Sequence, residues 1–212
     1  MATHSQQQSY DVCIVGSGAA GGMAAKRLTE AGAQVVLLEA GPEWHAPQQA
    51  PMFRWPYESP RRGAATERPF GEFDAALGGW EIDGEPYTTT EGTEFDWFRS
   101  RMLGGKTNHW GRISLRFGPD DFKAESVDGL GENWPIGYED IAPYYDRIDQ
   151  MIGLFGTEEG IPNAPDGIFM EPPEPRCYER FLLENTQDLP VDFVPSRLSI
   201  ITEQLGDRPA CH

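Results

Sequence analysis

The chain has 212 residues and a formal net charge of −17 at pH 7. That length can bury a sizeable core, whereas so acidic a chain is poorly suited to nucleic acid or anionic membranes, which both need a basic surface. No apolar run approaches a membrane span, and the N-terminus lacks the basic-then-apolar pattern of a secretory signal. Three scattered cysteines suit a reducing compartment. We therefore expect a cytoplasmic protein without nucleic-acid or membrane-spanning partners; a periplasmic protein whose leader has been removed is the alternative.

The segment 10–41 predicts a strand–helix–strand unit. Asp11–Val15 and Gln34–Glu39 are short apolar runs typical of buried parallel strands. Between them, Ala19–Glu30 places apolar residues on one helical face, and Gly32 follows as a helix C-terminal glycine. We expect a right-handed crossover between the two strands.

The turn between the first strand and the helix carries the spacing G-x-G-x-x-G at Gly16, Gly18 and Gly21. The first glycine permits a tight turn, the second lets a pyrophosphate approach the backbone, and the third lets the helix pack closely on the sheet. Glu39 lies near the offset of about 20 residues at which an acid binds a ribose hydroxyl, and it disfavours NADP. The alternative is an ordinary turn with chance glycines. The predicted cofactor-binding residues here are Gly16, Ser17, Gly18, Ala19, Ala20, Gly21, Glu39 and Ala40.

The regular alternation of strands and helices stops after this unit. Residues 42–98 are rich in proline, glycine and aromatic residues, and a loop of that length is uncommon unless it is functional. An irregular excursion directly after the first unit fits flavoproteins better than nicotinamide enzymes. Its aromatic residues could line a sugar site, but we expect burial for each of them. They are Trp44, Phe53, Trp55, Tyr57, Trp80 and Trp97.

Three further stretches are specific enough to indicate a family: LLEAGP, RMLGGKTNHWGR and ENWPIGYEDIAPYYDRID. Together with VGSGAAGG they resemble the glucose–methanol–choline (GMC) family of FAD-dependent oxidoreductases. The third stretch is similar to the branch that includes gluconate, fructose and glucoside dehydrogenases and pyranose 2-oxidase. The resemblance covers nearly the whole chain and implies FAD as the cofactor.

The resemblance implies a second flavin-contacting segment around the double glycine. Its predicted cofactor-binding residues are Arg101, Gly104, Gly105, Thr107, Asn108, His109 and Trp110. In pyranose 2-oxidase-like members the histidine in register with His109 is bonded covalently to the flavin, although Asn108 departs from that pattern. A covalent bond, a non-covalent flavin contact and a plain core histidine all remain open for His109.

The remaining sequence predicts a few elements and contacts. Tyr138–Ile152 has the apolar spacing of an amphipathic helix, and because Pro143 fits only the first turn, the helix should begin near Asp140. Residues 177–189 predict a short helix, and the sequence PSRLSI predicts a strand. Arg112 and Arg116, four residues apart, are expected to form ion pairs with acids rather than to touch phosphate. Cys13, inside the first strand, should be buried.

The predicted fold class is α/β: a Rossmann-like FAD-binding fold with an incomplete parallel sheet and a crossover helix, followed by a loop-rich insertion and the start of a substrate domain. In the complete enzyme we expect hydride transfer from an alcohol group, most simply of a sugar, to FAD. No catalytic or metal-binding residue is assigned, and we expect the chain to be truncated and to need its missing C-terminal half or a complementing subunit. The alternatives are a non-catalytic subunit of a split flavoenzyme and an NAD-dependent dehydrogenase.

The expected divisions are a disordered tail (1–9), the FAD-binding unit (10–41), an insertion serving as lid or subunit contact (42–98), the second flavin segment (99–125), and a helix with the start of the substrate domain (126–212).

Overall fold

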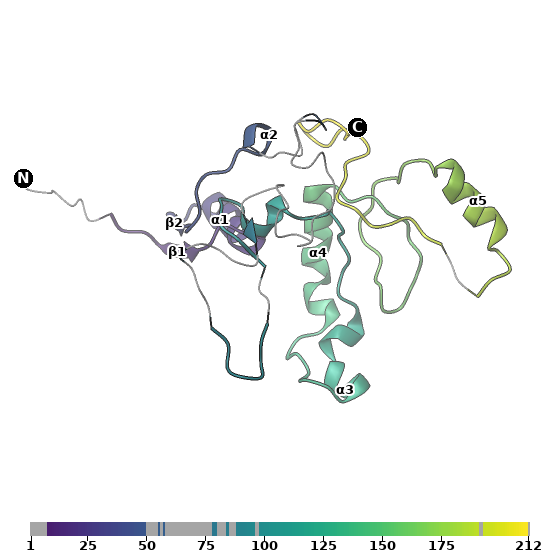
Figure 1. The fold of residues 1–212 in the computed structure, drawn as a ribbon, viewed down its shortest axis with the longest axis horizontal. Coiled ribbons are helices and arrows are strands. Elements are labelled where there is room, and N and C mark those ends of the chain that lie inside the picture. Colours follow the sequence, from purple (N-terminus) through teal and green to yellow (C-terminus); the bar gives the residue numbers. More distant parts are fainter. Residues whose placement is uncertain are drawn as a thin grey trace, which may run out of the picture. The chain divides into compact units, whose positions relative to one another are not determined.

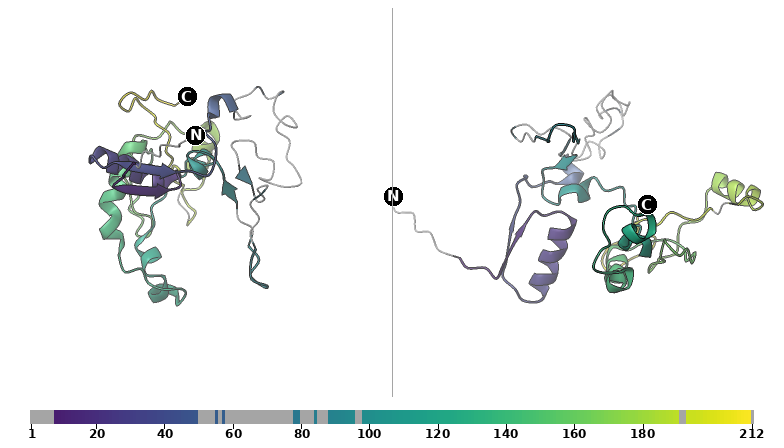
Figure 2. Two further views of the ribbon diagram at one scale, coloured as in Figure 1. Left: turned by 90° about the vertical axis from the view of Figure 1, so that its left-hand side faces the viewer. Right: turned by 90° about the horizontal axis from the view of Figure 1, so that it is seen from below.

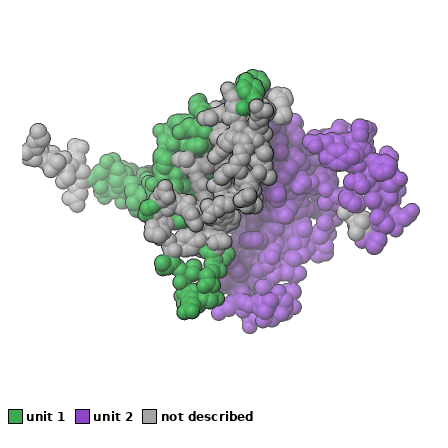
Figure 3. Space-filling model, in the orientation of Figure 1, with its two compact units in different colours: residues 1–110 green, residues 111–212 purple. Residues whose placement is uncertain are grey.

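The computed structural model describes residues 8–49, 55, 57, 78–79, 84, 88–95, 98–190 and 193–211. The chain divides into two compact units, residues 1–110 and residues 111–212 (Figure 3). Within the described ranges, no helix has both the length and the apolar character needed to cross a membrane.

The first unit is built on a strand–helix–strand arrangement (Figure 1). Strands β1 (Val12–Val15) and β2 (Val35–Leu38) pair in parallel, with Val12 opposite Val35. Helix α1 (Ala19–Glu30) connects them and packs against both (Figure 2). The predicted α/β unit is therefore confirmed. Strand β1 begins one residue later than predicted, and β2 is one residue shorter than predicted at each end.

Helix α1 ends where its glycine predicts. Gly32 has a φ of +91°, a left-handed conformation that favours glycine. Its N–H donates to the carbonyl of Thr29, and the N–H of Ala33 donates to the carbonyl of Leu28. These two bonds form a Schellman motif and satisfy carbonyls that the helix end would otherwise leave open.

The two-stranded sheet is covered on one face only among the described residues. Cys13 is exposed, which makes the prediction of a buried thiol wrong. Val15 and Leu38 are also exposed, at 83% and 53%. The prediction assumed a sheet buried on both faces, as parallel sheets usually are, whereas α1 half-buries the alternate residues Val12 and Ile14.

Beyond β2 the first unit has short elements. The pair β3 (Gly78–Gly79) and β4 (Arg99–Ser100) is antiparallel, and the described part of this unit also contains α2 (Ala46–Gln49) and the 3-10 helix η3 (Gly105–Asn108). Much of the predicted insertion, including Phe53, Trp80 and Trp97, lies outside the described residues. Trp55 and Tyr57 are 66% and 68% exposed and stack on each other, so burial was the wrong prediction for these two.

The second unit is organised around its longest helix (Figure 1). Its elements are the 3-10 helix η4 (Pro119–Phe122), α3 (Ala124–Asp128), α4 (Tyr138–Ile152) and α5 (Cys177–Asn185). Its buried apolar residues are Phe122, Leu154, Phe155 and Ile201. Around them, the chain after α4 is held by isolated bridges rather than by a continuous sheet.

Helix α4 begins earlier than predicted. Its first residue is Tyr138, so Pro143 lies in the second turn rather than the first. The Asp140 carboxylate accepts a hydrogen bond from the N–H of Gly137 and fixes the start. The Tyr138 hydroxyl also accepts a hydrogen bond from Arg116, so a tertiary contact holds the turn that precedes the proline.

Two predictions for the C-terminal part differ in extent from the structure. The predicted helix at residues 177–189 is present but ends at Asn185. The predicted strand at residues 195–200 is wrong, because only Leu198 makes β-bridges, one to Ile113 and one to Phe155. The N–H of Ile200 turns back to the carbonyl of Leu198, which stops the segment from extending as a strand.

Candidate functional site

The turn between β1 and α1 has the geometry that its glycines predict. Gly16 adopts a φ of +91°, and its N–H donates to the carbonyl of Leu38 at 2.7 Å, which anchors the turn to β2. A Cβ on Gly21 would lie 1.9 Å from the carbonyl oxygen of Gly16 and 3.3 Å from Ile14. Only glycine at position 21 therefore allows α1 to pack this closely on the strand and its turn.

The N-terminus of α1 is open to a ligand at its first turn. Gly18 is the N-cap residue, and no side chain caps the helix. The N–H groups of the first turn, including those of Ala19 and Ala20, have no intrahelical acceptor by geometry. A Cβ on Gly18 would meet no atom within 4 Å. Such a helix end, with space beside its N-cap, fits a pyrophosphate group.

Glu39 follows β2 and is already held by the loops around it. Its Oε2 accepts hydrogen bonds from the Ser17 hydroxyl and, at 2.9 Å, from the Ser17 N–H. Its Oε1 accepts one from the N–H of Gly41, also at 2.9 Å. These bonds, that of the Ser17 side chain first among them, lower the pKa of Glu39 from 4.5 to about 2. Because the folded-state pKa is depressed, ionised Glu39 stabilises the fold above pH 4.5, and this contribution is lost as the pH falls toward 2.

The second predicted segment forms a tight turn that needs both of its glycines. Gly104 and Gly105 have φ values of +92° and +53°, which L side chains rarely adopt. The Thr107 hydroxyl donates to the carbonyl of Gly104. The Asn108 amide donates to the carbonyls of Leu103 and Gly105, at 3.0 and 3.3 Å. The two polar side chains therefore brace the Gly-Gly turn.

The structure brings the two predicted segments into direct contact. The N–H of Gly104 donates to the Ser17 hydroxyl oxygen at 2.8 Å, although 87 positions separate the two residues. A Cβ on Gly105 would lie 3.3 Å from the Cα of Gly18. The glycine-rich turn and the Gly-Gly turn thus meet within the first unit and form one candidate site.

A second contact beside this site was not predicted. The N–H of Leu103 donates to the carbonyl of Pro42 at 2.8 Å. A Cβ on Gly41 would come within 2.1 Å of the backbone nitrogen of Met102, whose side chain is fully buried. The sequence showed Gly41 and Pro42 in the stretch LLEAGP, but nothing in it indicated which segment would press against them.

The remaining predicted residues of the second segment lie on either side of the turn. Arg101, half-buried, precedes the Gly-Gly turn, while Trp110 is 44% exposed. His109 closes η3 through its own N–H, and its ring meets Phe98 edge to face, with 5.1 Å between centroids. Both ring nitrogens of His109 are shielded from solvent. Ala40 follows Glu39 and is exposed.

Comparison with known proteins agrees with this geometry. Residues 9–53 match the family model described as "FAD binding domain". Paromamine 6'-oxidase from Streptomyces fradiae is 32% identical over 99% of this chain, and 2-methyl-1,2-propanediol dehydrogenase from Mycolicibacterium austroafricanum is 32% identical over 94%. The large subunit of fructose dehydrogenase from Gluconobacter japonicus is 29% identical over 74% of this chain. The chain belongs to the GMC family of FAD-dependent oxidoreductases.

The similarity covers only part of each of these relatives. The matches span 34% of the paromamine oxidase, 35% of the propanediol dehydrogenase and 30% of the fructose dehydrogenase subunit. The chain therefore spans about a third of the length of these GMC-type relatives, and the part it shares includes both glycine segments.

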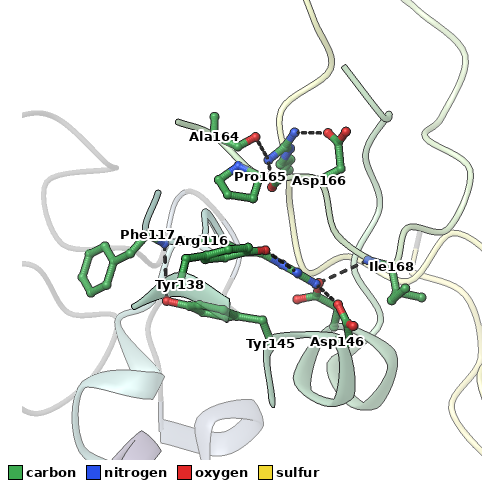
Figure 4. Close-up of polar contacts among 11 residues, drawn as sticks. Arg116, Phe117, Tyr138, Tyr145, Asp146, Ala164, Pro165, Asp166 and Ile168 are labelled. Carbon is green, nitrogen blue, oxygen red and sulfur yellow. Dashed lines mark hydrogen bonds and ion pairs between the residues drawn. The ribbon is translucent and has the colours of Figure 1, made fainter. Parts of the chain in front are cut away.

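A separate polar cluster of this GMC family member lies in the second unit and is structural (Figure 4). Arg116 pairs with Asp149 and Asp146 at 2.5 and 2.6 Å, and it lies over the ring of Tyr145. Burial by itself lowers the pKa of Arg116, but its hydrogen bonds, first that to Asp149, raise it above the ordinary value. The predicted ion pairing of Arg116 is confirmed. Among the described residues, no group of three His, Cys, Asp or Glu could hold a metal ion.

Proposed function

We propose that this chain supplies the FAD-binding part of an oxidoreductase that oxidises an alcohol group, on a sugar or a related polyol, by hydride transfer to the flavin. The observation that carries the proposal is the contact between the glycine-rich turn and the Gly-Gly turn, made by Gly104 and Gly105 against Ser17 and Gly18. Relatives named for the oxidation of paromamine, 2-methyl-1,2-propanediol and fructose support the substrate class.

The residues of the site have complementary roles in this proposal. The open N-terminus of α1 binds the pyrophosphate through its N–H groups, and Gly18 leaves room for the approach. Glu39 accepts a hydrogen bond from a ribose hydroxyl, and the Gly-Gly turn supports the flavin side of the cofactor. When bound, FAD supplies the hydride acceptor, and the protein orients it and shields it from water.

The proton of the alcohol needs a base that we do not assign to this chain. We propose that a further polypeptide, either the remaining length seen in the relatives or a complementing subunit, provides that base and completes the substrate site. In the same proposal, residues 42–98 form a lid or a subunit contact, residues 126–212 begin the substrate domain, and the location is cytoplasmic.

Cofactor binding by the purified chain tests the central proposal. FAD is expected to raise the melting temperature, and the rise should continue with the logarithm of the FAD concentration above the dissociation constant, whereas NAD is expected to leave it unchanged. Titration of flavin fluorescence gives the dissociation constant directly. Stabilisation by NAD but not by FAD, or a colourless protein even after co-expression with the polypeptide that completes the family's length, would contradict the proposal.

The state of His109 gives a separate prediction. We expect FAD to be bound without a covalent bond, because both imidazole nitrogens are shielded from solvent and the ring packs on Phe98. Acid precipitation of the FAD-loaded protein should therefore leave a colourless pellet and a yellow supernatant. A yellow pellet from the wild-type protein that turns colourless in His109→Ala would show that the covalent bond exists.

A further inference from the structure

The hydroxyl of Ser17 lies at the meeting point of three segments. Ser17 is only 8% exposed. Its oxygen accepts a hydrogen bond from the N–H of Gly104 at 2.8 Å, and its proton is donated to the carboxylate of Glu39. The three segments are the glycine-rich turn, the end of β2 and the Gly-Gly turn.

The direction of these bonds is fixed by the chemistry of the groups. A hydroxyl has one proton and two lone pairs, a backbone N–H can only donate, and an ionised carboxylate can only accept. The Ser17 proton must therefore point to Glu39, which leaves a lone pair for Gly104. A bond to a charged acceptor is stronger than a neutral one and polarises the next bond in the chain.

The other contacts at this junction do not link Glu39 to the Gly-Gly turn as the Ser17 hydroxyl does. Gly105 approaches Gly18, and Gly41 approaches Met102, through backbone contacts that allow close packing. The Gly41 N–H also orients the Glu39 carboxylate, through Oε1, but it makes no hydrogen bond to the Gly-Gly turn. Ser17 does both, because its N–H and its hydroxyl bind the same oxygen of Glu39 while its oxygen holds Gly104.

We propose that Ser17 is a positioning residue whose hydroxyl fixes Glu39 and the Gly-Gly turn in the arrangement that receives FAD, so that its side chain serves the protein rather than acting as a ligand of the cofactor. This inference rests on the proposed function, since it assumes that FAD occupies the site. We name the set formed by Ser17, Glu39 and Gly104 the Ser17 clasp.

The test compares wild type with Ser17→Ala and with Thr29→Ala. Thr29 is the matched control, because its exposed hydroxyl bonds only to carbonyls of its own helix α1. Ser17→Ala should weaken FAD binding by about 10- to 100-fold, the range expected when a buried hydrogen bond is left unmade. Without FAD, it should also speed hydrogen exchange at the Gly104 amide and raise the pKa of Glu39 toward its ordinary value. Thr29→Ala should match wild type in all three measurements.

The outcomes separate this inference from the proposed function. If wild type does not bind FAD, the proposed function fails and the role of Ser17 fails with it. If wild type binds FAD and Ser17→Ala binds it equally well, the role of Ser17 alone is overturned, even where exchange at Gly104 has changed. Should Ser17→Ala not fold, the wild-type protein still decides: a Glu39 carboxyl titrating near 4.5 rather than about 2, by carbon NMR, would overturn the clasp.

Discussion

Replacing Asp149 by alanine is expected to lower the free energy of unfolding by about 3–5 kcal/mol, the cost of breaking a buried ion pair from one side. The side chains of Asp149 and Arg116 are each 5% exposed. The variant would leave the Arg116 guanidinium buried without its best acceptor, and it would also remove the acceptor of the Ile168 N–H. Urea denaturation of the two proteins at neutral pH measures the difference.

Asp146 provides a matched control on the same helix. It accepts from the same Arg116 nitrogen as Asp149, but its side chain is 46% exposed. Asp146→Ala should therefore cost only about 0–1 kcal/mol, as exposed ion pairs do. Equal losses for the two variants would show that burial does not decide the strength of this cluster.

Replacing Gly21 by alanine should destabilise the chain by about 1–3 kcal/mol, as overpacking does, and should abolish FAD binding. A Cβ at this position would lie 1.9 Å from the Gly16 carbonyl oxygen, which is backbone and cannot move aside alone. Helix α1 would have to shift away from the turn that carries Gly18. Urea denaturation and flavin titration measure the two effects separately.

The neighbouring Gly22 is the control for this variant. A Cβ on Gly22 would meet its nearest atom, the Ser17 carbonyl oxygen, at an ordinary 3.6 Å. Gly22→Ala should therefore stabilise α1 by about 0.5–1 kcal/mol, since alanine favours a helix interior over glycine. FAD binding should be retained. Loss of binding in both variants would mean that the helix as a whole, rather than the contact at Gly21, is sensitive to change.

Local patterns predicted the strand–helix–strand unit closely. The apolar runs gave β1 and β2, and the glycine spacing gave the turn and both ends of α1. These features depend on residues near one another in the chain: Gly16 and Gly32 take positive φ values where only a glycine fits easily. The position of the Gly-Gly turn was likewise predictable, because residues 104 and 105 lie in a stretch that resembles the GMC family.

Contacts between distant segments decided what those patterns could not. Helix α4 starts at Tyr138 despite Pro143 in its second turn, and besides the local bond from Gly137 to Asp140 a distant residue, Arg116, holds that first turn through the Tyr138 hydroxyl. The exposure of Cys13 depends on which face of the sheet α1 covers, and no residue in β1 encodes that.

By itself, the sequence determined the chemistry of this protein: an FAD-binding unit with two glycine segments, an acid after the second strand, and membership of an oxidoreductase family. The tertiary structure alone decided how these parts are joined. Ser17 bonds to Glu39, 22 positions away, and to Gly104, 87 positions away. Nothing in the sequence around a serine indicates which distant residue its hydroxyl will meet. Chain folding buries Ser17 and leaves Glu39 and Gly104 half-buried beside it, and a buried hydroxyl must find a partner within the protein.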